Sequence, residues 1–433
     1  MRTKEQIKKD IYSLVKEYYT RFLSTKSEFI PVSGKKYDEK EIISIIDAAL
    51  DGWWTEGRVT AEFEEKFKEF LKIKNVIVVN SGSSANLLAI KALTSPKLKD
   101  KRLKPGDEVI TVAAAFPTTV NPIIEAGAVP VFCDVKIGTY NIKVSELKKA
   151  LSNKTKAVML AHTLGNPFNL EYVVKFCKEN KLWLIEDACD ALGSKYKNKM
   201  VGTFGDIATF SFYPAHHITM GEGGAVVTNN ALLARIIRSM RDWGRDCWCK
   251  TGQDNTCGKR YAWKLGELPY GYDHKYIYSE IGYNLKNTDL NVAIGIAQME
   301  KLPDFIVARR RNFERLFEGI KKFEKYFYLP KAEPHSEPSW FGFLLTIKED
   351  AGFKREELLK FLEDEKIGTR LLFAGNITKQ PYFIENKIKY RTVGNLKNTD
   401  LIMKNTFWIG VCPLIEEKDI KKIISAFERF IKR

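Results

Sequence analysis

Short apolar runs alternate with helical segments through the first half of the chain, and this alternation limits the possible folds more than any other feature. The runs have the length of strands and are rich in valine, isoleucine and leucine, which is typical of strands buried in a sheet. A regular β/α alternation predicts a mostly parallel sheet. The predicted strands are residues 76–79, 108–112, 131–135, 157–162, 182–187, 207–212 and 225–228.

The composition is that of a soluble globular protein, with 44% hydrophobic and 29% charged residues. At 433 residues, the chain is long enough for two domains. Its longest apolar runs are far shorter than a membrane span, and its charged first residues lack an apolar signal core, so we expect a cytoplasmic protein. The formal net charge of +16 is scattered over helices, which argues against nucleic-acid binding and suits a diphosphate ligand or an acidic partner.

Changes in the pattern along the chain divide it into three regions. Residues 3–27 have the spacing of an amphipathic helix. Late in the long β/α region we expect two helices, over 291–301 and through 309–311, and short strands and helices follow from about residue 322. We predict a helical N-terminal extension (1–35), a large domain (36–310) with a cysteine-rich insertion (241–278), and a small C-terminal α/β domain (311–433).

The segment 211–224 joins two predicted strands and carries the clearest chemical signal. It reads Ser-Phe-Tyr-Pro-Ala-His-His-Ile-Thr-Met-Gly-Glu-Gly-Gly, and its glycines permit backbone geometry that side chains forbid. The adjacent His216 and His217 can exchange protons near neutral pH. Residues 80–86 follow another predicted strand, and small residues at a helix N-terminus form an anion site. We therefore expect one catalytic loop and one anion-binding turn.

The chain has seven cysteines, and an odd number without a signal peptide argues against a disulfide framework. Cys247, Cys249 and Cys257 lie close together in a polar, glycine-containing segment, which indicates a metal site. Their spacing does not distinguish zinc from an iron–sulfur cluster, and reduced free thiols are the third alternative. A fourth ligand must come from elsewhere in the chain, and Cys189 is the candidate.

The segment 211–224 resembles the matching segment of sugar aminotransferases of the DegT/DnrJ/EryC1/StrS family, which have the pyridoxal phosphate (PLP)-dependent fold type I. In that family the pattern is Ser-Phe-x-x-x-Lys followed by Gly-Glu/Asp-Gly-Gly, and the lysine holds the cofactor as a Schiff base. Here His216 stands at the position of the lysine. Family members with histidine there are sugar 3-dehydratases that use non-covalent pyridoxamine phosphate (PMP). The resemblance implies an α/β fold like that of aspartate aminotransferase, in which a mainly parallel seven-stranded sheet forms the large, PMP-binding domain.

The resemblance also implies where the cofactor binds. Asp187 ends a predicted strand and matches the aspartate that keeps the pyridine nitrogen protonated. Phe116 matches the aromatic residue that stacks on the ring, although a core position is the alternative. Asp190 stands where aminotransferases of the family carry glutamine or histidine. The residues implied at the cofactor phosphate are Gly82, Ser83, Ser84, Ser211 and, from the neighbouring subunit of a homodimer with shared active sites, Asn284.

By the same resemblance, His216 is the catalytic base; Tyr213 and His217 are near enough in the sequence to assist it. A structural histidine in an inactive relative is the alternative for His216. The turn at 52–58 matches a family segment that touches the sugar nucleotide; the alternative is a turn that its tryptophans anchor to the protein. Arg370 could hold a nucleotide phosphate, and the alternative for it is a structural ion pair. The residues implied near the substrate are Trp54, Thr55, Arg58, His217 and Arg370.

The Cys189, Cys247, Cys249 and Cys257 spacing resembles the [2Fe–2S] ligand set of the 3-dehydratases that act on CDP-4-keto-6-deoxyglucose. This implies C-3 deoxygenation of a nucleotide-diphospho-4-keto-6-deoxyhexose, with electrons from a separate flavin or iron–sulfur reductase, on the route to the 3,6-dideoxysugars of lipopolysaccharide O-antigen. Three alternatives differ from this function. An aminotransferase would need lysine at 216, a non-redox GDP- or TDP-sugar 3-dehydratase would not need the cysteines, and a zinc-stabilised sugar-nucleotide-binding protein would not be an enzyme.

Overall fold

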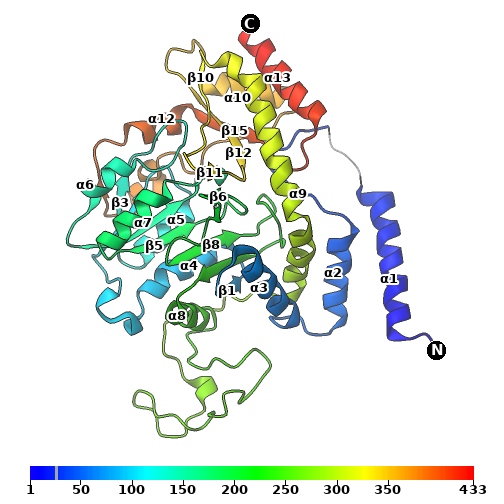
Figure 1. Ribbon diagram of the computed structural model, residues 1–433, viewed down its shortest axis with the longest axis vertical. Coiled ribbons are helices and arrows are strands. Elements are labelled where there is room, and N and C mark those ends of the chain that lie inside the picture. Colours follow the sequence, from blue (N-terminus) through cyan, green and yellow to red (C-terminus); the bar gives the residue numbers. More distant parts are fainter. Residues whose placement is uncertain (25–27) are drawn as a thin grey trace.

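The computed structural model describes residues 1–24 and 28–433, and an eight-stranded sheet lies at its centre (Figure 1). The strand order is β1-β9-β8-β5-β4-β2-β3-β14, in which neighbours from β8 to β14 are parallel and β9 is antiparallel to β1 and β8. The strands are β1 (Asn75–Val79), β2 (Glu108–Val112), β3 (Val129–Cys133), β4 (Thr155–Ala161), β5 (Trp183–Asp187), β8 (Ile207–Ser211), β9 (Gly224–Thr228) and β14 (Arg391–Thr392).

Seven of these strands confirm the predicted ones, each within two residues at either end. They were recognisable because alternate residues enter two different cores: Val76 and Val78 of β1 pack in one, and Ile77 and Val79 in the other. The eighth strand, β14, has two residues and no apolar run. Arg391 fastens it to the sheet, since its Nε and Nη2 donate to the Glu108 carboxylate of β2 at 3.0 and 2.7 Å.

Helices cover both faces of the sheet. On one face, α4 (Gly82–Leu93) and α8 (Ala231–Arg241) share a core with the strands, and on the other α3 (Arg58–Leu71) and α7 (Leu170–Glu179) do so. None of the described helices is long and apolar enough to cross a membrane. The remaining helices beside and between the strands are α2 (Glu39–Leu50), α5 (Pro117–Glu125), α6 (Leu147–Ala150), α11 (Pro381–Glu385) and α12 (Lys397–Asn405).

The long helix α9 (Asp289–Ile320) connects the two halves of the molecule (Figure 1). We expected two helices in this region, and that prediction was wrong. Pro303 lies inside α9, but apolar side chains are buried on both sides of it, and the packing outweighs the hydrogen bond that proline removes. The first part of α9 packs on α2 and α3, whereas Phe313, Leu316 and Ile320 enter a separate C-terminal core.

A second sheet organises the C-terminal region, with the order β10-β12-β15-β13 and every pair antiparallel. The helices α10 (Arg355–Asp364) and α13 (Glu417–Ile431) contribute to its core. A division near residue 311 stays a proposal, because α9 spans it and β14 returns to the large sheet. The strands are β10 (Phe327–Tyr328), β12 (Gly342–Ile347), β13 (Thr369–Arg370) and β15 (Thr406–Gly410), and a small third sheet contains β6 (Lys195–Tyr196), β7 (Lys199–Met200) and β11 (Ser336–Glu337).

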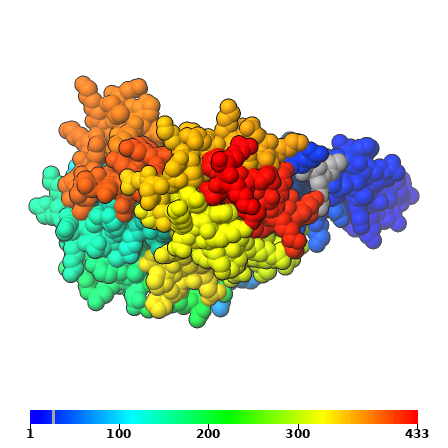
Figure 2. Space-filling model, turned by 90° about the horizontal axis from the view of Figure 1, so that it is seen from above, coloured from blue at the N-terminus to red at the C-terminus, as the bar shows by residue number. Residues whose placement is uncertain are grey.

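The N-terminal helix α1 (Lys4–Tyr18) projects from one end of the molecule (Figure 2). It continues into a short π-helical turn, Tyr19–Leu23, and the last residues of the predicted helix, 25–27, lie outside the described residues. Every residue of α1 is at least partly exposed, and Lys8 and Tyr12 attach it to Asp47 of α2.

Candidate active site

The carboxyl ends of the parallel strands open into a cavity of about 560 Å³. Segments that follow β1, β2, β5 and β8 form its walls, and residues of the C-terminal region close it from the other side. Ligands collect at this end of an open α/β sheet. The lining residues that the sequence had singled out are Gly82, Ser83, Phe116, Asp187, Cys189, Asp190, Ser211, Tyr213, His216 and Arg370.

One wall of the cavity is the N-terminus of α4. Ser81 caps this helix, because its Oγ accepts from the Ser84 amide at 3.0 Å. A Cβ atom on Gly82 would lie 2.5 Å from the Ser211 Cβ, so only glycine lets the helix approach Ser211 this closely. The helix amides and the Ser211 hydroxyl together suit a phosphate group. Ser84 supports this wall from behind and does not line the cavity.

Beside this wall lies a buried carboxylate, Asp187. Its Oδ2 accepts from Asn86 Nδ2 at 2.8 Å and Thr119 Oγ1 at 2.7 Å, and its Oδ1 accepts from the Cys189 amide at 3.2 Å. Phe116 is half exposed at the cavity, with its ring edge-on to Phe373. An aromatic surface, a fixed carboxylate and a phosphate site fit a phosphorylated pyridine ring. The sequence interpretation missed Asn86 and Thr119, although Asn86 lies one helical turn after Gly82 on α4.

His216 lies on the turn that follows β8, where its amide donates to the Tyr213 carbonyl at 2.9 Å. Its Nδ1 is 3.3 Å from Asp190 Oδ1, without the alignment of a hydrogen bond. The ring also faces Phe341, with 5.2 Å between centroids. An imidazole beside a carboxylate can accept and return a proton. No lysine is found among the described residues that line this cavity.

Several residues predicted near the ligand lie elsewhere in this chain. His217 is buried and its Nε2 is 2.8 Å from the Ser339 carbonyl; burial and the nearby Arg309 charge lower the pKa of His217 well below its usual value. The Trp54 side chain is exposed. The Thr55 backbone carbonyl accepts a hydrogen bond from the Asp289 amide, and the Arg58 side chain forms an ion pair with Asp51. Asn284 is exposed and pairs through its backbone with Asp242, away from the cavity of its own subunit.

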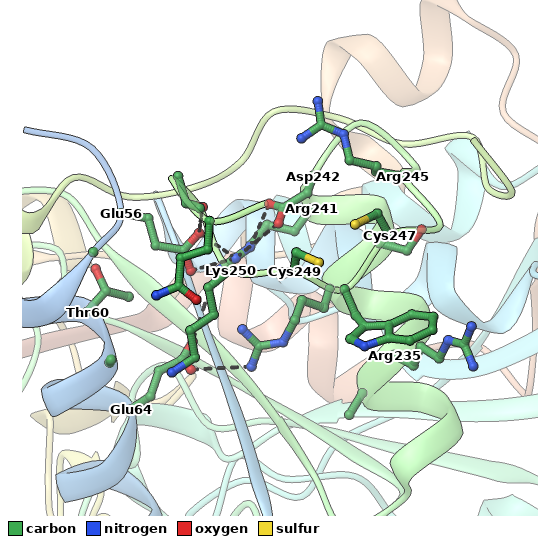
Figure 3. A pocket seen from close by; sticks show the side chains of 18 of the residues that line it. Glu56, Thr60, Glu64, Arg235, Arg241, Asp242, Arg245, Cys247, Cys249 and Lys250 are labelled. Carbon is green, nitrogen blue, oxygen red and sulfur yellow. Dashed lines mark hydrogen bonds and ion pairs between the residues drawn. The ribbon is translucent and has the colours of Figure 1, made fainter. Parts of the chain in front are cut away.

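A second cavity, of about 850 Å³, lies between α3, α8 and the cysteine-rich insertion (Figure 3). Cys247 and Cys249 line it, and Cys257 lies beside them. Hydrogen bonds, chiefly from Thr256, outweigh burial and lower the pKa of Cys249 to about 7. Arg241 of α8 lies between Glu56 and Asp242 in the same wall (Figure 3).

The four predicted cluster ligands are therefore divided between the two cavities. Cys189 faces the first cavity, and burial and Asp187 raise the pKa of its thiol well above the usual value. Across the part of the chain that the structure describes, no three His, Cys, Asp or Glu side chains are arranged to hold a metal ion. The donor set in this arrangement does not fit a [2Fe–2S] cluster.

The two ends of the insertion meet at a narrow neck. The Trp243 amide donates a hydrogen bond to the Tyr283 carbonyl, and the Tyr283 amide donates one to the Met240 carbonyl, each at 2.6 Å. A Cβ atom on Gly244 would lie 1.9 Å from the Glu280 carbonyl oxygen, and one on Gly282 would lie 1.9 Å from the Gly244 nitrogen. Backbone therefore packs directly on backbone, which requires glycine at both positions.

The mostly parallel sheet with its ligand cavity, together with the second antiparallel sheet, defines the fold type I of PLP-dependent enzymes, as predicted. The model of the DegT/DnrJ/EryC1/StrS aminotransferase family matches residues 35–428. The chain belongs to this family, the sugar aminotransferase family, and is an enzyme.

Relatives within the family include enzymes named as 3-dehydratases. The chain is 54% identical over 433 residues to the lipopolysaccharide biosynthesis protein RfbH of Salmonella typhimurium, with 99% of each chain covered. It is 52% identical over 401 residues to the dTDP-4-dehydro-2,6-dideoxy-D-glucose 3-dehydratase of Saccharopolyspora spinosa, covering 93% of this chain and 86% of that one. The solved structure of E. coli GDP-4-keto-6-deoxy-D-mannose-3-dehydratase with bound hydrated PLP has a TM-score of 0.79 and 30% identity, covering 92% and 98% of the two chains.

Proposed function

We propose that this protein is a nucleotide-sugar 3-dehydratase that uses non-covalent PMP. The observation that carries the proposal is His216 beside Asp190 in the ligand cavity, at the position where aminotransferases of the family carry their Schiff-base lysine. Imidazole cannot replace that amine in covalent cofactor attachment, but it can move protons. The relatives named as 3-dehydratases support the same reaction.

The residues of the cavity fit the cofactor. Gly82 and Ser83 at the start of α4, with Ser211, would hold the phosphate, and Phe116 would cover one face of the ring. Asp187, fixed by Asn86 and Thr119, would hold the pyridine nitrogen. When bound, such a cofactor supplies an electron sink for the carbon skeleton of the substrate.

The protein side chains then handle the protons. His216 would take up the proton that the elimination releases and would pass a proton to the departing C-3 hydroxyl of the sugar, which leaves as water. Asp190 faces its Nδ1 and can stabilise the charge that the imidazole gains. Phe116, Phe341 and Phe373 line the cavity and limit access of water. Tyr213 is half exposed at the same cavity and is in place to assist.

The substrate that we propose is a nucleotide-diphospho-4-keto-6-deoxyhexose, most directly the CDP-linked sugar. Among the described residues that line the cavity, Arg370 is the one arginine or lysine, whereas three are acidic: Asp187, Asp190 and Glu222. A cofactor phosphate and a substrate diphosphate need more positive or donor groups than these. The side-chain amide of Asn284 from a second subunit would add a donor to this cavity. We therefore propose a homodimer with shared active sites.

The first test is turnover with defined substrates. Purified protein is incubated anaerobically with PMP and with CDP-, dTDP- or GDP-4-keto-6-deoxyhexose, and products are followed by mass spectrometry and NMR. We expect a product that has lost the C-3 hydroxyl. Stable transfer of the amino group to C-4 with the C-3 hydroxyl retained would identify an aminotransferase and overturn the proposal.

The [2Fe–2S] cluster and its reductase are the finer part of the proposal and depend on the cysteine spacing. The four thiols are divided between two cavities and do not form one ligand set in this arrangement. Analysis of iron and acid-labile sulfide after anaerobic purification tests the cluster that the spacing suggests: about two of each per chain, with a brown colour, would mean that the four thiols come together around a cluster. Iron held in this way should be lost in Cys257→Ser and kept in Cys177→Ser, a buried thiol of α7. Zinc, or no metal, would favour the non-redox 3-dehydratase.

A further inference from the structure

The N-terminal linker, residues 30–36, contributes one wall residue to the ligand cavity. It precedes α2 in the chain, and Ser33 in its middle lines the cavity together with Arg370 and Trp408 of the C-terminal sheet. No other described residue before Ser81 lines this cavity. The sequence interpretation assigned most of this linker to the N-terminal extension and gave it no role in the site.

The first half of the N-terminal linker is paired with the segment that leads into β13. The Ile30 amide donates to the Lys366 carbonyl, and the Ile30 carbonyl accepts from the Gly368 amide, each at 2.9 Å. A Cβ atom on Gly410 of β15 would lie 2.5 Å from the Pro31 carbonyl oxygen, so the linker packs backbone to backbone on this sheet. These backbone contacts fix the position of the linker beside the C-terminal sheet.

The second half of the N-terminal linker is fixed to α9. Gln298 of α9 is buried, and its Nε2 donates to the Lys36 carbonyl at 2.9 Å. Within the linker, the Val32 side chain is buried in the hydrophobic core, whereas Ser33, the next residue, is partly exposed and lines the cavity. A segment that is anchored on both sides presents its side chain to a ligand without the entropy cost of ordering a loop.

Two polar groups at this side of the cavity can form further hydrogen bonds. The Ser33 hydroxyl forms none with any residue that the structure describes. Arg370 follows Gly368 in the segment that pairs with the linker, and its guanidinium donates to the Thr369 carbonyl at 2.8 Å. It pairs with no carboxylate in the described part of the chain. A free hydroxyl and an unpaired guanidinium suit an anionic ligand with oxygen acceptors, such as a phosphate.

Other hydroxyl groups of the cavity are already engaged on the side of the proposed cofactor. Ser81 caps α4, and Thr119 Oγ1 donates to Asp187 at 2.7 Å. Ser211 lies against the start of α4, where Gly82 leaves room for it. Ser33 differs from these residues because it comes from the linker beside β13. It is therefore available to a second phosphate-containing ligand that enters from the C-terminal side.

We propose that Ser33 is a substrate-binding residue: its hydroxyl donates to a phosphate oxygen of the nucleoside diphosphate whose charge Arg370 balances. This inference rests on the proposed function for the nucleotide-sugar substrate and adds the part of the site that holds its diphosphate. A hydrogen bond to an ionised oxygen is stronger than one between neutral groups. The diphosphate then lies at the linker and β13, and the start of α4 is left to the phosphate of the cofactor.

Calorimetric titration of the PMP-saturated protein with CDP, dTDP and GDP tests the proposal without turnover. Ser33→Ala removes the hydroxyl, and Ser33→Thr keeps it. Lys36→Met is the matched control, because it removes a whole positive charge from an exposed side chain of the same linker that does not line the cavity. Arg370→Gln and the double variant Ser33→Ala/Arg370→Gln measure whether the two side chains bind the same group.

Ser33→Ala should raise the Kd of the nucleoside diphosphate that binds most tightly about 5–20-fold. Ser33→Thr and Lys36→Met should stay within about twofold of the unchanged protein. The loss in the double variant should be smaller than the product of the two single losses, because side chains that bind one group are not independent. With a nucleotide sugar that is turned over, Ser33→Ala should raise KM and leave kcat nearly unchanged. The affinity for PMP should not change.

An unchanged diphosphate affinity in Ser33→Ala would overturn the proposal. Weaker binding of the nucleotide sugar alone would place Ser33 at the sugar ring, and weaker binding of PMP would place it at the cofactor; either result contradicts the diphosphate contact. An equal loss in Lys36→Met would mean that any change in the linker disturbs the cavity. A protein that binds a nucleoside diphosphate through Ser33 but leaves the C-3 hydroxyl of every nucleotide sugar in place would refute the proposed function and not this contact.

Discussion

Replacing His216 by asparagine should lower the turnover of a nucleotide-diphospho-4-keto-6-deoxyhexose about a thousandfold. Asparagine fills nearly the same space and retains polarity, but it cannot accept a proton at neutral pH. The variant should bind PMP as tightly as the unchanged protein. Asp187, which would hold the pyridine nitrogen, and the start of α4 at Gly82, which would hold the phosphate, are not changed. Single-turnover kinetics and the absorbance of bound cofactor measure the two quantities separately.

A matched control for this prediction is His335→Asn. His335 is exposed, and its backbone φ of 65° is one that asparagine tolerates well. Its turnover should stay within about twofold of the unchanged protein, since surface substitutions have small effects. If His216→Asn retained more than a tenth of the activity, the base would have to be another cavity residue, and Tyr213 or Glu222 would be tested next.

The largest loss of stability is expected from Arg241→Met. The Arg241 side chain is 2% exposed, and its Nη2 donates to both oxygens of Glu56, at 2.6 and 2.8 Å. Its Nη1 donates to the Val78 carbonyl at 2.9 Å and its Nε to Asp242 at 3.0 Å. Removing one partner of a buried charge network leaves the others unpaired, which costs about 3–5 kcal/mol. Urea unfolding followed by circular dichroism should show this as an earlier first transition.

Arg235→Met on the same helix is the control for Arg241→Met. The Arg235 side chain is 54% exposed and its nearest carboxylate, on Asp246, is 4.0 Å away. Exposed pairs of this kind contribute about 0–1 kcal/mol. A loss of less than 1 kcal/mol in Arg241→Met would mean that Glu56 and Asp242 find solvent or other partners, and the buried network would not be a main source of stability.

The central sheet could be predicted from the sequence because its strands are buried on both faces. Such strands are continuous apolar runs, and the signal does not depend on distant residues. β14 lacked this signal, since the pairing of Arg391 with Glu108 comes from residues far apart in the chain. The sequence predicted two helices where the structure has α9. The helix stays continuous past Pro303 because it packs on α2 and α3, and such tertiary contacts are not visible in the local sequence.

The candidate site was predictable where it follows the ends of strands. Gly82, Phe116, Asp187 and His216 meet in one cavity because the carboxyl ends of parallel strands share one edge. The direction of a side chain on a loop is less accessible to such reasoning. His217 points into the core although it adjoins His216.

Arg309 shows the same limit from the opposite direction. It belongs to a run of three arginines that resembles a solvated helix surface, and nothing local separates it from the exposed Arg311. Only the tertiary structure shows that Arg309 faces the catalytic loop, because the helix turns it toward the Trp340 and His216 carbonyls.

The neck at Gly244 and Gly282 makes the segment between them structurally separable from the rest of the fold. The backbones at Gly244 and Gly282 are in contact where the chain enters and leaves this segment. Deleting the segment between them would therefore leave two chain ends close enough to be joined. A long surface segment of this kind adds little closure entropy and does not change the register of any strand. Cys247, Cys249 and Cys257 lie in this separable segment, whereas Cys189 follows β5 of the central sheet.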